Sequence, residues 1–182
     1  MLVPPGWDYW LGTDQFGRDI LTRLVYVART VLFVGLVSAF LGATTGLVLG
    51  VASVCFGGTF YLLSMRFIDA FMAFPVIIMA LAIVSIFGSD LHFIILAITL
   101  PIIPDCALNV RSNALQIGAI PYVDAARALG FTQVRIILRH MLPNVMAPVL
   151  IIMTSAIGGA ILLEASLSFL GMGGQEPTPA WA

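Results

Sequence analysis

The charged side chains of this chain are few, and many of them gather in one segment. Residues 122–144 read YVDAARALGFTQVRIILRHMLPN and lie between long apolar stretches. Four of the eight arginines fall in or just before this segment, and the chain has no lysine: Arg111, Arg127, Arg135 and Arg139. Guanidinium groups pair well with carboxylates on another protein. The chemistry that this segment predicts is therefore docking to a partner, with no bond-making.

Several kinds of catalytic site lack the residues that they need. A phosphate-binding P-loop and a Schiff-base site both require a lysine, and no HExxH or GxSxG motif is present. We expect ordinary interfacial and loop roles for His92 and His140. Cys55 and Cys106 lie in apolar or span-end surroundings, where free cysteine behaves as a small hydrophobic residue. We therefore predict no catalytic residue, no metal and no cofactor on this chain.

The composition is that of an integral membrane protein. Hydrophobic residues make up 60% of the chain and charged residues 9%, and the mean hydropathy is +1.08. A spanning helix needs about 20 mainly apolar residues. The third candidate below is short and carries two prolines, which predicts a kinked or partly re-entrant segment. Four spans are predicted, at Thr30–Phe56, Phe67–Phe87, Leu91–Ala107 and Met146–Leu170.

The distribution of arginines predicts the orientation and the division of the chain. Basic loops remain on the cytoplasmic side, which places the loop 108–145 in the cytoplasm and both chain ends outside. Arg66 agrees with this orientation, whereas the basic residues before residue 30 disagree with it and are offset by nearby aspartates. We expect an external segment with an amphipathic helix (1–29), one transmembrane domain (30–170) and an external C-terminal segment (171–182).

Local signals predict a short helix inside the charged segment. Pro121 is suited to the first turn, and Asp124 would face the positive end of the helix dipole. Gly130 is a natural residue just past the helix end, which leaves about two turns. Small side chains permit close docking, at Ala125, Ala126 and Ala128. The alternative is an ordinary helix that links two spans.

Small residues recur every four positions in the first span. Ser38, Gly42, Gly46 and Gly50 would lie on one stripe of a helix, where another backbone can approach closely. Glycine in a helix interior costs about 1 kcal/mol relative to alanine, which favours a packing role over chance. The partner helix can belong to this chain or to another.

These motifs together resemble the permease subunits of ABC importers, in the peptide and nickel branch of that family. The segment Asp124-Ala125-Ala126, with Gly130 and then Leu142-Pro143, resembles the EAA motif, and RHMLPN resembles the ending that follows it. The resemblance implies that Tyr122–Gly130 is a coupling helix seated on an ATP-binding subunit, and it adds Arg127 and Arg139 to the coupling residues. Asp124 stands where the family usually has glutamate.

Three further segments match the same branch. Residues 11–19 read LGTDQFGRD, and Thr13 or Asp14 is expected to cap the helix that follows. Arg66 and Asp69 lie in an MRxxD segment that Pro75 follows, and they are expected either to pair locally or to act in transmission or gating. Glu164, late in the last span, is a functional-site candidate or has already reached the headgroup region. Glu164 is also the first residue of the third matching segment, which ends with PTPAW at 177–181.

The resemblance implies a fold and a function. The fold is all-α, a type I permease-like bundle with about four transmembrane helices of a usual six, because the match does not include the family's first and last spans. Before Arg111 the chain also lacks the family's usual tryptophan and second arginine, so this end of the third span is expected to be arranged differently. The function is a permease subunit that forms part of a pathway for peptides or similar small solutes in a bacterial or archaeal inner membrane.

The expected partners are a second permease subunit, ATP-binding subunits that hold ATP and magnesium, an external substrate-binding protein and membrane lipid, with no nucleic acid. One alternative is a truncated, non-transporting remnant of such a permease. An intramembrane enzyme is a less favoured alternative, because the chain lacks the catalytic motifs named above.

Overall fold

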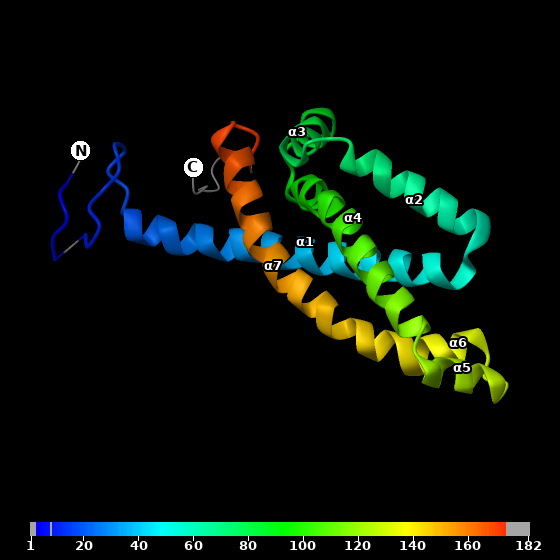
Figure 1. The fold of residues 1–182 in the computed structure, drawn as a ribbon. Coiled ribbons are helices and arrows are strands. Elements are labelled where there is room, and N and C mark those ends of the chain that lie inside the picture. Colours follow the sequence, from blue (N-terminus) through cyan, green and yellow to red (C-terminus); the bar gives the residue numbers. More distant parts are fainter. Residues whose placement is uncertain (1–2, 8, 174–182) are drawn as a thin grey trace.

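The computed structural model describes residues 3–7 and 9–173, with every side chain in these ranges except that of Arg127. In the described part of the chain the regular structure is helical, joined by turns and loops, and an isolated antiparallel bridge links Thr13 and Asp19. Figure 1 shows α1 running through the bundle, with α4 and α7 crossing it and α5 and α6 gathered at one end. The elements are α1 (Ile20–Phe56), α2 (Gly58–Met72), α3 (Val76–Phe87), α4 (Leu91–Gly118), α5 (Pro121–Ala128), α6 (Gln133–Ile136), the π-helical turn η1 (Ile137–Met141) and α7 (Leu142–Phe169).

Three helical stretches are long and apolar enough to cross a membrane. They are α1, α4 and the continuous run Gln133–Phe169, which joins α6, η1 and α7. The pair α2 and α3 also qualifies when taken together, but its two helices meet at 89°. The structure therefore has three unbroken candidates and a fourth one that is bent at a break. The prediction of Phe67–Phe87 as one continuous helix is wrong.

Pro75 explains the break between α2 and α3. Proline has no N–H to donate, and its ring disfavours helical geometry at the residue before it. α2 accordingly ends at Met72, and α3 begins at Val76, directly after the proline. The Pro75 carbonyl then accepts the N–H of Met79 at 3.0 Å and starts the new helix.

The other predicted spans differ from the helices mainly at their ends. α1 begins at Ile20, so the expected amphipathic helix before residue 30 is the first part of α1 and no separate element. α4 continues through Pro101 and Pro104 to Gly118, about 42 Å in all, as one helix with no re-entrant break. The last helix has already begun before Met146, at Leu142.

The stripe of small residues on α1 packs against α4. A Cβ atom built on Gly46 would lie 2.6 Å from the Cβ of Cys106 and 2.9 Å from the carbonyl oxygen of Ile103. At Gly50 it would lie 2.7 Å from the carbonyl oxygen of Ala107. Real side chains do not approach so closely, so the two backbones lie together only because these positions are glycine. The helix partner that the sequence left open belongs to this chain.

Two apolar clusters hold the bundle together, one toward each end of α4. The first joins α1, α3, α4 and α7, and Val34, Val84, Ile98 and Leu167 lie within it. The second joins α1, α4, α5, α6, η1 and α7. Its members are Ala43, Val51, Cys106, Val110, Ala114, Val123, Ala126, Ile136, Met141, Val145 and Val149. The short helices after α4 are therefore packed onto the spans.

Candidate functional site

The short helix α5 begins and ends at the residues that local signals predict. It begins at Pro121, carries Asp124 in its first turn and ends at Ala128. Gly130 has a φ of +82°, which an L-residue with a side chain rarely adopts. The backbone N–H of Phe131 then donates to the carbonyl oxygen of Ala126 at 3.1 Å. This bond and the left-handed glycine form a Schellman cap, which fixes the direction of the chain after α5.

The inner face of α5 is anchored in the bundle. Val123 is fully buried and Ala126 is 6% exposed, and both belong to the cluster that includes Ile136 and Met141. Burying side chains of this size contributes roughly 1–2 kcal/mol each. The helix is thereby part of the same apolar cluster as the ends of α4 and α7.

The predicted coupling residues divide between the two faces of α5 and the turn that follows. Ala126 is on the buried face, whereas Tyr122, Asp124, Ala125 and Gly130 are exposed. Arg127 lies in the last turn of α5. In the next turns Arg139 and Pro143 are exposed and Leu142 is half-buried.

Exposed apolar side chains continue through the segment that follows α5. Leu129 is 77% exposed, Val134 64% and Leu138 60%. The guanidinium of Arg135 stacks on the ring of Phe131, with its central carbon 4.5 Å from the ring centroid. Apolar side chains next to arginine are common in protein interfaces. The sequence predictions did not include these apolar positions, although the spacing of Val134 and Leu138 by four residues was a signal that they share a helix face.

A π-helical turn joins α6 to α7. Proline has no N–H, so Pro143 cannot donate a hydrogen bond to the carbonyl of Arg139. The turn that precedes it is π-helical, with hydrogen bonds between residues five apart. The ring of His140 in this turn lies 5.5 Å from that of Tyr122 and 6.4 Å from that of Phe131. The turn thus packs its histidine against α5 and against the segment after α5. No local sequence signal indicated this contact of His140.

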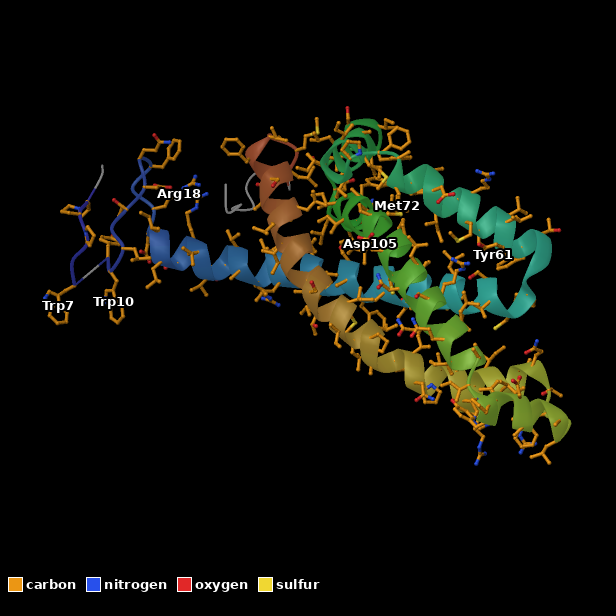
Figure 2. The ribbon with its side chains drawn as sticks, in the orientation of Figure 1. Trp7, Trp10, Arg18, Tyr61, Met72 and Asp105 are labelled. Carbon is orange, nitrogen blue, oxygen red and sulfur yellow. The ribbon has the colours of Figure 1, made fainter. Side chains whose placement is uncertain are left out.

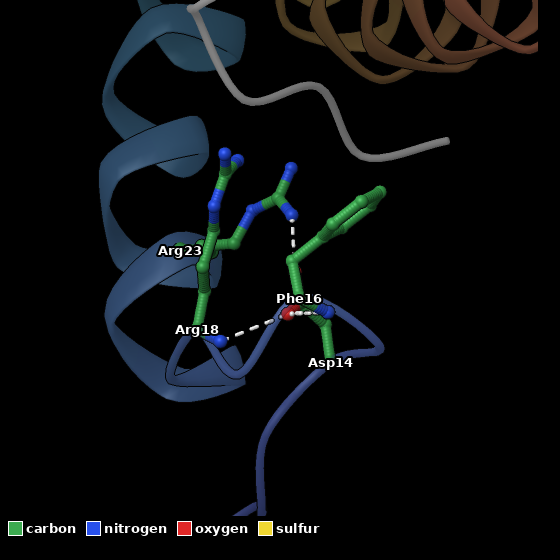
Figure 3. Close-up of polar contacts among 4 residues, drawn as sticks. All are labelled: Asp14, Phe16, Arg18 and Arg23. Atoms are coloured by element: carbon green, nitrogen blue, oxygen red, sulfur yellow. Dashed lines mark hydrogen bonds and ion pairs between the residues drawn. The ribbon is translucent and has the colours of Figure 1, made fainter. Parts of the chain in front are cut away.

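The GTDxxGRD segment folds into a loop around one carboxylate. Oδ1 of Asp14 accepts the backbone N–H groups of Phe16 and Arg18, each at 2.8 Å, and Oδ2 accepts from the Arg23 guanidinium at 2.7 Å (Figure 3). These donors, the Arg18 N–H foremost, lower the pKa of Asp14 below its usual value. The expectation that Thr13 or Asp14 caps α1 is wrong. Asp19 is the cap, and its side chain accepts the N–H groups of Leu21 and Thr22.

The predicted pair Arg66 and Asp69 does not form an ion pair. Both side chains are exposed on α2, and the ion pair found in the described part of the chain joins Arg23 to Asp14. A long-range contact links α2 to α4 instead. Arg111 donates to the hydroxyl of Tyr61 at 2.9 Å and also lies over its ring, 4.6 Å from the centroid. Figure 2 shows Tyr61 near the start of α2, 50 residues from Arg111 in sequence.

Glu164 is buried in α7 and is 7% exposed. Within the described residues its Oε2 atom has no hydrogen-bond partner. Its neighbours along the same helix face, Ala160, Leu163 and Leu167, belong to the apolar cluster at this end of the bundle. The PTPxW segment that follows in the sequence lies outside the described residues. Among those residues, no group of three His, Cys, Asp or Glu side chains is placed to hold a metal ion.

The fold is that of a transporter's membrane subunit. A chain of the MetNI methionine ABC transporter, solved in inward-facing conformations, superposes with a TM-score of 0.75 over 85% of this chain and 77% of that chain. The sequences are 23% identical, so this likeness concerns the fold alone. The prediction of an all-α bundle of the ABC importer permease type is confirmed.

Sequence comparison identifies the family. Residues 42–182 match the family described as binding-protein-dependent transport system inner membrane component, and the chain belongs to this family. It is 46% identical over 178 residues to a putative peptide transport system permease protein of Brucella suis biovar 1, which covers 98% of this chain and 60% of that protein. This chain is therefore similar to a protein named as a putative peptide transport permease, and the predicted family is confirmed.

Two other relatives give the same assignment. Identity is 40% over 180 residues with the dipeptide transport system permease protein DppC of Alkalihalophilus pseudofirmus, covering 99% of this chain and 59% of that protein. The glutathione transport system permease protein GsiD of Escherichia coli O1:K1 is 38% identical over 177 residues, which cover 97% of this chain and 58% of that protein. The chain spans about 60% of the length of the curated relatives it matches.

Proposed function

We propose that this chain is a membrane-spanning permease subunit of an ATP-driven importer. It forms part of the translocation pathway for peptides or similar small solutes, and it docks a separate ATP-binding subunit through α5. The family and the fold support the transport role. The names of the relatives, which include peptide, dipeptide and glutathione systems, support a peptide-like solute.

The outer face of α5 carries the coupling part of the proposal. Tyr122 and Leu129 are exposed there, next to the exposed arginines of the following turns. The same helix is held from inside by Val123 and Ala126. An element with a fixed inner face and an uncovered apolar and charged outer face is suited to receive a partner.

The proposed mechanism is a rigid-body switch. Closure of a pair of ATP-binding subunits, which hold ATP and magnesium, would displace α5 and with it the ends of α4 and α7. In this arrangement the α5 end faces the cytoplasm of a bacterial cell, and the GTDxxGRD loop faces outward. A second permease subunit completes the pathway, an external binding protein delivers the solute, and this chain makes and breaks no bonds itself.

Arg127→Glu in the complete importer tests the coupling. Reversal of this charge is expected to weaken docking at least about tenfold, a loss of about 1.4 kcal/mol, and thereby to lower ATP-dependent uptake. The amount of the chain in the membrane should remain unchanged. Arg18→Glu, the same charge change at the opposite end of the molecule, is the matched control and should retain uptake. Normal uptake by Arg127→Glu would refute docking through α5.

A further inference from the structure

A cavity of about 410 Å³ opens between α3, α4 and α7. Ile98 and Pro101 line it from α4, and Ser155 and Leu163 line it from α7. The volume lies within the usual range of small-molecule sites, about 300–1,000 Å³. On the α7 wall a Cβ atom added to Gly159 would meet nothing within 4 Å, so there is room for a ligand.

Asp105 is the charged residue among those that line this cavity. Figure 2 shows it on the middle part of α4, about 21 Å along the helix from Leu91. Its side chain is exposed, and no ion pair in the described part of the chain includes it. The sequence predictions gave Asp105 no role, although an ionisable residue within an apolar span was a signal for one.

The placement of Asp105 indicates what its carboxylate faces. An aspartate inside a spanning helix costs up to about 2.5–3.5 kcal/mol in membrane insertion, the value at the helix centre, so such residues face water, protein or a ligand and avoid lipid tails. Asp105 is among the residues that line the cavity, whereas the next side chain, Cys106, is turned about 100° around the helix toward α1, where its Sγ lies 3.3 Å from the carbonyl oxygen of Ala43. Asp105 therefore lies on the side of α4 that faces the cavity.

We propose that Asp105 binds the protonated amine of a transported solute inside this cavity. The rest of the ligand would lie against Ile98 and Leu163, and the Ser155 hydroxyl would offer a neutral polar group on the opposite wall. A solute with an ammonium group beside a small apolar part, such as a short peptide with a free amino terminus, fits this set by charge and by polarity. The inference rests on the proposed function, since it assigns the cavity to the solute pathway.

The first experiment measures the charge selectivity of the cavity without transport. Ser155→Cys is introduced into the assembled importer in a Cys55→Ser background, since Cys106 is fully buried. Its labelling rate is compared for a trimethylammonium and a sulfonate methanethiosulfonate reagent. Asp105→Asn should lower the cation-to-anion rate ratio about tenfold, and the matched change Asp90→Asn, at the start of α4, should not. Equal ratios with and without the Asp105 charge would overturn the proposal.

The second experiment uses ligands on the same labelled importer. Alanyl-alanine should protect the introduced cysteine, whereas N-acetyl-alanyl-alanine should not. Asp105→Asn should raise the concentration of alanyl-alanine needed for half-protection about ten- to a hundredfold, as expected when a charge-assisted hydrogen bond is lost. Equal protection by both peptides, or equal protection with and without the Asp105 charge, would overturn the proposal.

Two further measurements separate this inference from the proposed function and from a partner contact. If the Asp105 carboxylate instead pairs with a basic residue of the second permease subunit, Asp105→Asn will release that subunit on purification, which overturns the proposal. ATP-dependent uptake of alanyl-alanine is measured in the same vesicles. Uptake without amine-dependent protection refutes the role of Asp105 and leaves the transport function in place. Protection without any uptake retains the amine site but refutes its assignment to a transported solute.

Discussion

The close approach of α1 and α4 should make Gly46 intolerant of any side chain. Alanine at this position would place its Cβ atom 2.6 Å from the Cβ of Cys106, 2.9 Å from the Ile103 carbonyl oxygen and 3.1 Å from the Ala107 nitrogen. Two of these three atoms belong to the backbone of α4, which cannot rotate away as a side chain can. The substitution must therefore separate the two helices.

Two opposing contributions set the size of the effect. Alanine favours a helix interior over glycine by about 1 kcal/mol. Overpacking of a close contact costs about 1–3 kcal/mol, and more where the backbone must shift. Because the contacts of Gly46 are to backbone, we expect the upper end of that range and a net loss of about 2 kcal/mol. For a chain of this size that lowers the unfolding midpoint by about 4–8 °C.

The assay is thermal unfolding of the purified importer in detergent, with two substitutions that grade the effect. Gly158→Ala is the matched control, because its Cβ would meet nothing within 4 Å, and it should leave the midpoint unchanged or raise it. Gly42→Ala should be milder than Gly46→Ala, since one of its two contacts below 3 Å is to the Cγ2 atom of Ile102, which can rotate, and its backbone contact is longer, 3.3 Å to the carbonyl oxygen of Thr99. If Gly46→Ala and Gly158→Ala unfold at the same temperature, the close backbone packing of α1 against α4 is refuted.

Two more predictions concern the loops at either end of the molecule. The lowered pKa of Asp14 means that its carboxylate stabilises the loop fully above the ordinary pKa of an aspartate, and that this stabilisation is lost as the pH falls through the lowered value. At neutral pH, Asp14→Asn should therefore raise hydrogen exchange at the amides of Phe16 and Arg18, and unchanged exchange would contradict the contacts in Figure 3. Gly130→Ala should destabilise the end of α5 by about 1–2 kcal/mol because of its positive φ, with faster exchange at the Phe131 amide. Gly118→Ala, within α4, is its control, and equal exchange in both variants would contradict the Schellman cap.

The parts that could be predicted from the sequence are those set by neighbouring residues. α5 begins at a proline and ends before a glycine, and both signals act over a single turn. The stripe of glycines was visible because helical spacing brings every fourth residue to one face. The helix that this stripe packs against could not be predicted. Ile103 and Cys106 lie far away in sequence, and which span meets the stripe depends on how the whole bundle packs.

Hydropathy located the spans but not the helix ends. It follows apolar character, whereas a helix ends where its hydrogen bonding ends. α4 continues past Ala107 through Arg111 to Gly118 because nothing there interrupts the backbone ladder. Conversely, apolar residues on both sides of Pro75 look like one span although the proline separates two helices.

Pairing was predicted between two charges that are three residues apart, whereas the contact of an arginine on α4 joins residues that are 50 apart in sequence. Arg66 and Asp69 are close enough on α2 to pair, but an exposed local pair contributes only about 0.2–0.5 kcal/mol, which holds two long side chains weakly. The contact between Arg111 and Tyr61 combines a hydrogen bond with stacking over the ring, and it joins two helices. Only the assembled fold brings those two residues together.

The proposed docking face and the proposed amine site are joined by the same two helices. α4 runs from Asp105 to Gly118 and α7 from Leu142 to Leu163, and Val123 and Ala126 of α5 share an apolar cluster with residues of α4, α6, η1 and α7. Close-packed helices move as units, because their interiors resist local compression. A displacement of α5 would therefore change the spacing of α4 and α7 at the cavity walls, where Asp105 and Ser155 lie on opposite sides. In this chain the proposed route from an ATP-driven movement to release of a bound amine would run from α5 directly to α4, and through α6 and η1 to α7.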